Sequence, residues 1–150
     1  MINKIVKTVR TINKNVVLKD FAIAESNGRV KKMRQIERMI KRVYNIKPEV
    51  IYVDEKHKAL FHKSSVKGAY TTDRNRVVVY LNKDYKANIK TLCHELTHSY
   101  QHTHNTERYL KSCEALREGR VLYRNAWHEV DARQQAEIMC EYYYGLKNVI

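Results

Sequence analysis

The stretch from Thr91 to His104, "TLCHELTHSYQHTH", holds four histidines and one glutamate in fourteen positions. It contains the pattern H-E-x-x-H, formed by His94, Glu95 and His98. On a helix, side chains four residues apart lie above one another on the same face, so two imidazoles can reach one ion at about 2.0–2.1 Å. Glu95 points about a quarter-turn away, which suits a base acting on a metal-bound water better than a ligand. The spacing therefore predicts one Zn2+ per chain, with His94 and His98 as ligands and Glu95 as general base.

Two further histidines compete for the place of third ligand. His102 continues the ladder of every fourth residue, but three stacked imidazoles would place the last about 12 Å from the first, too far for one ion. His104 lies where the metzincin signature H-E-x-x-H-x-x-G-x-x-H has its third histidine. Gln101 replaces the glycine that would let the chain turn out of the helix there, so we expect the helix to continue and to carry His104 away. His104 remains the alternative ligand.

A third candidate, Glu129, lies in "WHEVDARQQAE" near the carboxyl terminus. A carboxylate from a second helix would complete a His2Glu set with water in the fourth position, the arrangement of a catalytic zinc. Ala132 and Ala136, on the following turns, are small enough to let this helix lie close to the metal helix. This favours Glu129 over the other acidic candidates, Glu118, Glu137 and Glu141. The alternative is an exposed helix glutamate.

The apolar residues recur at helical spacing in several segments that would position these side chains. The predicted helices span residues 2–14, 30–44, 85–102, a short stretch from 106, and 126–144. Asn82 or Asp84 can cap the helix that carries the H-E-x-x-H pattern, and Gly145 is expected to close the last helix.

The middle of the chain has the shorter period of β-strands. Its β-branched and aromatic runs are "EVIYV" (49–53), "ALFH" (59–62), "GAYTT" (68–72) and "RVVVYL" (76–81). They predict three or four antiparallel strands. Amino-terminal helices, a small mostly antiparallel sheet, then a zinc-binding helix and a long carboxy-terminal helix indicate an α+β fold.

Length and composition set the general class of the protein. A chain of 150 residues without a Gly- or Ser-rich linker is the size of one domain, 1–150. Its amino terminus has no continuous apolar run, so we expect no signal peptide, no membrane contact and a cytoplasmic location. Three isolated cysteines without a C-x-x-C pair are expected to be free thiols.

The net charge of +13 is concentrated in residues 1–47, which carry thirteen Lys or Arg and three Asp or Glu. This basic, predicted helical segment can attract nucleic acid or another polyanion. A solvated helix face is the alternative, because no aromatic-basic motif or recognition-helix pattern accompanies the charge.

Three motifs together resemble gluzincin metallopeptidases, in particular the minimal single-domain minigluzincins and the related ImmA/IrrE-type and SprT-like zinc proteases. They are "GAYTTDRNRVVVYLN" (68–82), "TLCHELTHSYQH" (91–102) and "EVDA" (129–132), and they lie within about half of the chain. The resemblance implies a zincin-like fold, with His94, His98 and Glu129 as zinc ligands and Glu95 as base.

The same resemblance implies a peptide or protein substrate. It makes residues 77–81 an edge strand to which an extended peptide adds by main-chain hydrogen bonds, so that the contacts come from Val77, Val78, Val79 and Tyr80. The residue that stabilises the oxyanion is left open among Tyr123, His128, Tyr142, Tyr143 and Tyr144.

The sequence thus predicts a small zinc-dependent endopeptidase that hydrolyses peptide bonds through a zinc-bound water. The alternative is a non-proteolytic zinc protein whose basic helices bind nucleic acid or a protein partner. A third class is a metal-free basic adaptor.

Overall fold

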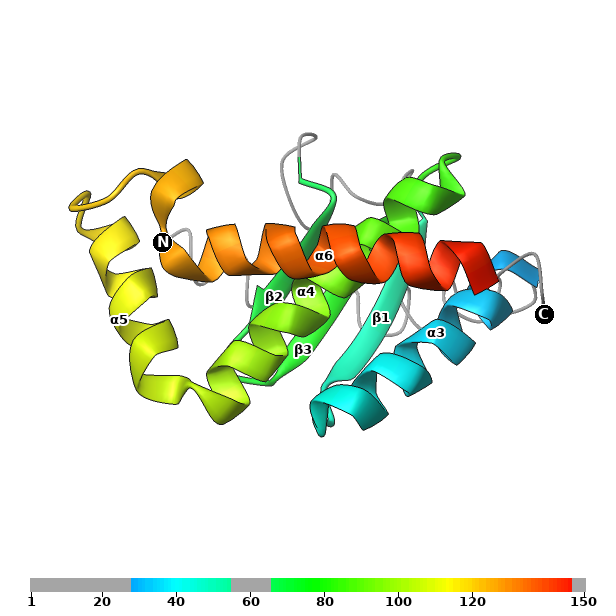
Figure 1. The fold of residues 1–150 in the computed structure, drawn as a ribbon, viewed down its shortest axis with the longest axis horizontal. Helices are drawn as coiled ribbons and strands as arrows, with labels where there is room; N and C mark the ends of the chain where they lie inside the picture. The colour runs from blue at the N-terminus through cyan, green and yellow to red at the C-terminus, as the bar shows by residue number, and fades with distance from the viewer. Residues whose placement is uncertain (1–27, 55–65, 147–150) are drawn as a thin grey trace, which may run out of the picture.

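The computed structural model describes residues 28–54 and 66–146 (Figure 1). It is an α+β fold with an amino-terminal helix, a three-stranded sheet and then three α-helices. The elements are α3 (Gly28–Tyr44), β1 (Glu49–Asp54), β2 (Gly68–Thr71), β3 (Arg76–Leu81), α4 (Tyr85–His104), α5 (Thr106–Arg117), the 3-10 helix η2 (Tyr123–Asn125) and α6 (Trp127–Leu146). The helix predicted at 2–14 and the strand predicted at 59–62 lie outside the described residues.

The sheet has the strand order β1-β3-β2 and is mixed, which corrects the expectation of a mostly antiparallel sheet. β2 pairs antiparallel with β3, with Gly68 opposite Val79, whereas β1 pairs parallel to β3, with Val50 opposite Val77. A strand has the same alternation of apolar and polar residues whether it pairs parallel or antiparallel to its neighbour. The sequence pattern therefore located the strands but could not give their direction.

β3 is the central strand, so the prediction of an edge strand at residues 77–81 is wrong. The main chain of Val77, Val78, Val79 and Tyr80 is paired with β1 on one side, and that of the first three also with β2 on the other. An added peptide strand needs unpaired N–H and C=O groups. These four residues therefore cannot bind an extended substrate as predicted, and the edge strands of the described sheet are β1 and β2.

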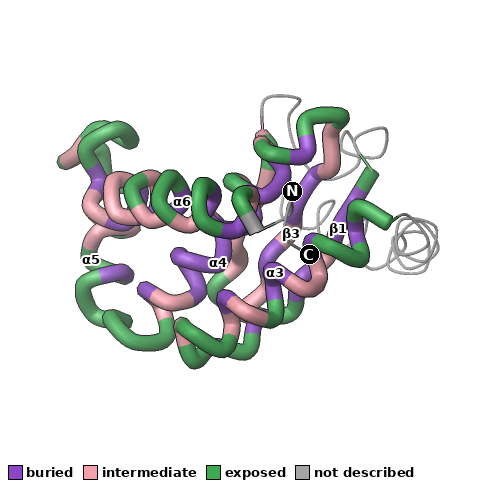
Figure 2. Tube along the Cα trace, turned by 45° about the vertical axis from the view of Figure 1, so that its right-hand side comes forward, coloured by how far each residue is buried: buried purple, intermediate pink, exposed green. Residues whose placement is uncertain are grey.

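The hydrophobic core lies between the sheet and the helices that cover it (Figure 2). Its fully buried side chains include Met33 and Ile40 of α3, Tyr52 of β1, and Leu92 and Leu96 of α4. α6 crosses α4 (Figure 1), and both Ala132 and Ala136 are buried, at 0% and 1% exposure. The small residues thus allow the close approach of the two helices that the sequence predicted.

The ends of α4 and α6 bear on the predicted site. Asp84 caps α4, because its side chain accepts a hydrogen bond of 3.1 Å from the backbone N–H of Ala87. α4 continues through Gln101 to His104, as predicted for a helix without the metzincin glycine. α6 runs to Leu146 and includes Gly145, so the prediction that Gly145 closes this helix is wrong.

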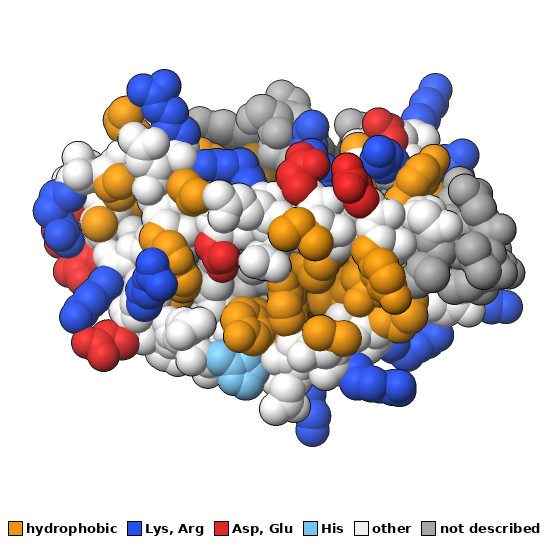
Figure 3. All heavy atoms as spheres, viewed as in Figure 1, with side chains coloured by type: hydrophobic (Ala, Val, Ile, Leu, Met, Phe, Trp, Pro, Cys, Tyr) orange, Lys and Arg blue, Asp and Glu red, His pale blue; other side chains and the backbone are white. Residues whose placement is uncertain are grey.

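The surface in the view of Figure 3 has hydrophobic side chains gathered over the carboxy-terminal half of α6 and the helices beneath it. The exposed large hydrophobic residues include Ile138 and Tyr142 of α6 and Val43 of α3. In the described part of the chain, no helix combines the length and the apolar character that crossing a bilayer requires.

Candidate metal centre

Three side chains from two helices meet at one point beside the sheet. His94 and His98 come from α4, and Glu129 comes from the first turn of α6. One ligand atom from each lies within 4.8 Å of the others. The Nε2 atom of His94 is 3.0 Å from Glu129 Oε2, and the Nε2 atom of His98 is 3.2 Å from Glu129 Oε1. We call these three residues the triad; they can hold a metal ion.

The spacing of the triad can be compared with the requirement of a tetrahedral ion. Ligand atoms about 2.0–2.1 Å from such an ion lie about 3.3–3.4 Å from one another. The two imidazole Nε2 atoms are 3.2 Å apart, close to that spacing. The donor set, two imidazole nitrogens and one carboxylate, also fits a first-row divalent metal ion.

Electrostatics keep the Glu129 carboxylate in the form that binds a metal. Burial alone would raise the pKa of Glu129, but the hydrogen bonds to His94 and His98 outweigh it and hold the pKa well below its usual range. Burial would lower the pKa of His98, but its hydrogen bond to Glu129 and the nearby carboxylate charges raise it. The protons on these rings and a metal cation therefore compete for the same carboxylate.

Gln101 fixes the orientation of the His98 ring. Its Oε1 atom is 2.9 Å from His98 Nδ1, and its amide nitrogen donates to the carbonyl of His128 at 3.0 Å and to Asp131 Oδ2 at 2.8 Å. Because the amide NH2 faces two acceptors, the oxygen must face the ring. Nδ1 of His98 then carries the proton and donates it, which leaves the lone pair on Nε2 for a metal.

The sequence analysis missed this role of Gln101 and used the residue only to argue against His104. A signal was present. Gln101 lies three residues after His98, which is a neighbouring position on the same helix face, and an amide side chain in that position can reach the ring.

We expect Gln101→Met to weaken metal binding without removing it. The substitution keeps the length of the side chain but leaves His98 Nδ1 without its acceptor, and loss of such an outer partner lowers metal affinity about 10- to 100-fold. Competition with a chromophoric chelator measures the affinity. The matched control is Ser99→Ala, which removes another part-buried hydrogen bond of α4, 2.8 Å to Asn75 Oδ1, that does not involve the triad. Equal affinities of the two variants would contradict the role of Gln101.

Glu95 lies next to the triad and faces a cleft. It is buried, and this burial raises the pKa of its carboxyl group. The cleft has a volume of about 510 Å³. Its lining comprises Val66, Lys67, Gly68, Ala87, Lys90, Thr91, His94, Glu95, Tyr123, Arg133 and Ala136. His94 and Glu95 are therefore accessible from the cleft, whereas His98 is only 5% exposed.

Gly68 of β2 brings the sheet edge against Glu95. A Cβ atom at this position would lie 2.6 Å from Thr91 Cγ2, 2.9 Å from the carbonyl oxygen of Val78 and 3.1 Å from Glu95 Cγ. Only glycine allows this approach. The edge strand and the helix that carries Glu95 therefore form adjacent walls of the cleft.

The structure brings two of the oxyanion candidates to the triad. The Tyr123 hydroxyl donates to Glu129 Oε2 at 2.9 Å, and the residue also lines the cleft. His128 Nε2 is 3.6 Å from Glu129 Oε1, while its Nδ1 atom is 2.7 Å from Ser112 Oγ. Burial lowers the pKa of His128, which keeps its ring neutral near pH 7.

The other three tyrosines lie elsewhere. Tyr143 is buried in the hydrophobic core, fourteen residues after Glu129, which is about 21 Å along a helix. Tyr144 packs against that core, and Tyr142 is 63% exposed. Tyr143 is thus not placed to act on a substrate at the triad.

The rival ligands are also separated from the triad. His102 Nδ1 is 2.9 Å from the Tyr70 hydroxyl, and His104 Nε2 donates to the carbonyls of Tyr44 and Asn45. Among the acidic alternatives, Glu118 pairs with Arg120 and Glu137 pairs with Lys90. In the described residues, the group that can hold a metal is His94, His98 and Glu129.

Comparison of the chain with protein-family models, with curated proteins and with solved structures finds no match.

Proposed function

We propose that the protein is a small zinc-dependent endopeptidase. The observation that carries this proposal is the meeting of His94, His98 and Glu129 beside a cleft into which Glu95 also faces. The resemblance of the H-E-x-x-H and E-V-D-A motifs to gluzincin metallopeptidases agrees with this assignment.

Zinc fits the triad better than magnesium or calcium does. Magnesium and calcium prefer sites with oxygen ligands only, whereas two imidazoles and one carboxylate are the usual set of a catalytic zinc. Such a set leaves one position for water. His94 lines the cleft, so that position can open toward a substrate.

The side chains around the triad can then perform hydrolysis. A zinc ion held by His94, His98 and Glu129 would supply a water of lowered pKa and would polarise the scissile carbonyl. Glu95 accepts a proton from that water and later delivers it to the leaving amine. The Tyr123 hydroxyl, now 2.9 Å from Glu129 Oε2, can turn from the carboxylate to donate a hydrogen bond to the oxyanion.

The position of β2 suggests how a peptide would lie. β2 is at the edge of the described sheet, and Lys67 and Gly68 line the cleft. An extended peptide can pair with this edge by main-chain hydrogen bonds. We therefore propose that the substrate strand pairs with β2 and not, as the sequence predicted, with β3.

Removal of the metal tests the assignment. We expect a chelator to abolish cleavage of a peptide library prepared from a digested proteome, and stoichiometric Zn2+ to restore it, as measured by mass spectrometry of the products. The core of α3, the sheet and α4 is apolar and does not include the triad, so the circular dichroism spectrum should change little. Unfolding on chelation would indicate a structural site, and zinc binding without cleavage would favour the non-proteolytic alternative.

A further inference from the structure

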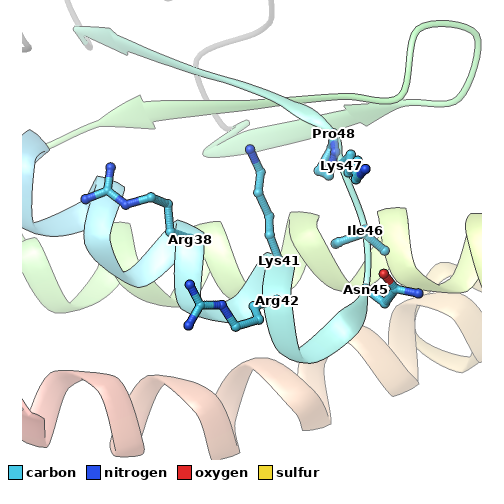
Figure 4. Close-up of a pocket in the computed structure, with 7 residues that line it drawn as sticks. All are labelled: Arg38, Lys41, Arg42, Asn45, Ile46, Lys47 and Pro48. Carbon is cyan, nitrogen blue, oxygen red and sulfur yellow. The ribbon is translucent and has the colours of Figure 1, made fainter.

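A second hollow lies far from the triad in the sequence, where α3 ends and the chain turns into β1. Its volume is about 440 Å³. Figure 4 shows its lining on the last turns of α3 and on the segment that leads to β1: Arg38, Lys41, Arg42, Asn45, Ile46, Lys47 and Pro48. We call it the basic hollow. It shares no lining residue with the cleft at the triad.

The backbone holds the shape of the basic hollow. Asn45 has a positive φ of 51°, and the N–H of Ile46 donates to the carbonyl of Lys41 at 3.0 Å while that of Asn45 points to the carbonyl of Arg42 at 3.3 Å. These two bonds form a Schellman motif, which ends α3 and reverses the chain. Ile46 and Pro48 are buried and anchor the segment that follows.

The acidic residues nearest to the hollow are already paired. Glu37 is 4% exposed and binds Arg34 at 2.7 Å and Lys41 at 2.8 Å. Glu49 binds Arg76 at 2.8 Å. Within the described residues, the remaining cations of the hollow, Arg38, Arg42 and Lys47, form no ion pair, and all three are exposed. Arg38 and Arg42 are one helical turn apart, where like charges repel.

We propose that the basic hollow binds the phosphate backbone of nucleic acid. Guanidinium groups bind phosphate oxygens through two parallel hydrogen bonds. Arg38 and Arg42 are about 6 Å apart along the helix axis, which allows each to hold a different phosphate. Lys47 adds a third cation on the segment that leads to β1. None of the described residues that line the hollow is aromatic. The contacts are therefore to phosphates and not to stacked bases, and binding is independent of sequence.

The test compares two variants of the full chain that lose the same charge. The hollow variant is Arg38→Gln, Arg42→Gln and Lys47→Gln; the control is Arg74→Gln, Lys83→Gln and Arg117→Gln, three other exposed cations. Fluorescence anisotropy measures binding to a short labelled DNA duplex of mixed sequence over a range of salt concentrations. We expect the hollow variant to bind at least about tenfold more weakly, with the slope of log K against log salt reduced by up to about 2.7. The control should change by less than about threefold.

Three results would overturn the proposal. They are no binding of the duplex by the unchanged protein, equal weakening of both variants, and competition by polyglutamate as effective as that by unlabelled DNA at equal charge. The last would identify an acidic polypeptide as the partner. Arg38→Lys with Arg42→Lys is a further check, because it keeps the charge but removes the paired hydrogen bonds, and it should give an intermediate affinity. Cleavage of the peptide library should be the same in all variants, which separates this proposal from that of the metal centre.

Discussion

Replacing Glu95 with glutamine is expected to abolish peptide hydrolysis while the metal remains bound. The carboxyl group lies beside the triad but is not one of its three ligands, so metal content should stay near one per chain. Glutamine has nearly the same shape, but it cannot accept a proton from water. Loss of a general acid–base lowers the rate by about 10²- to 10⁴-fold. Zinc analysis and product formation from the peptide library measure the two effects separately.

The control for this variant is Glu114→Gln, an exposed glutamate of α5. It should retain full activity. Cleavage by Glu95→Gln at the rate of the unchanged protein would reject the base assignment. Loss of metal from Glu95→Gln would instead place its carboxylate among the ligands and would require a different catalytic base.

Replacing Glu129 with alanine is expected to cause the largest loss of metal affinity from any change outside α4. Glu129 supplies the carboxylate of the triad. Its oxygen atoms lie 3.0 Å from His94 Nε2 and 3.2 Å from His98 Nε2. The loss should exceed the about 10- to 100-fold that follows removal of an outer partner. Activity should be lost with the metal. Chelator competition and metal analysis after gel filtration measure the result.

Glu141→Ala is the matched control on the same helix. Glu141 is exposed, and its loss should leave metal affinity and cleavage unchanged. Retention of tight metal binding by Glu129→Ala would show that the ion is held by another residue. His104→Ala would then be compared, because His104 was the competing ligand of the sequence analysis.

The helices and the triad could be predicted because their patterns are local or depend on small residues. The four-residue spacing of His94 and His98 determines a shared helix face. Glu129 could be chosen because Ala132 and Ala136 indicated where a second helix packs closely. In the structure both alanines are buried between the helices.

Other features depend on contacts that a single strand or helix pattern does not encode. The order and direction of the strands follow from pairing between distant segments, so β3 was wrongly assigned to the sheet edge. Tyr123 reaches Glu129 from a 3-10 helix in a connecting segment, and no periodicity would have selected it over Tyr143. Residues 1–27, which contain five of the thirteen Lys and Arg of residues 1–47, lie outside the described chain.

Gly68 has no side chain, and this allows β2 to lie close to α4, the helix that carries Glu95. Any larger residue there would meet the methyl group of Thr91, the carbonyl oxygen of Val78 and the methylene of Glu95. The strain would thus fall on Thr91, on the backbone of Val78 in β3 and on the side chain that carries the Glu95 carboxylate. A change at this position should therefore lower thermal stability as well as shift Glu95, because the distance between β2 and α4 determines where the Glu95 carboxylate lies.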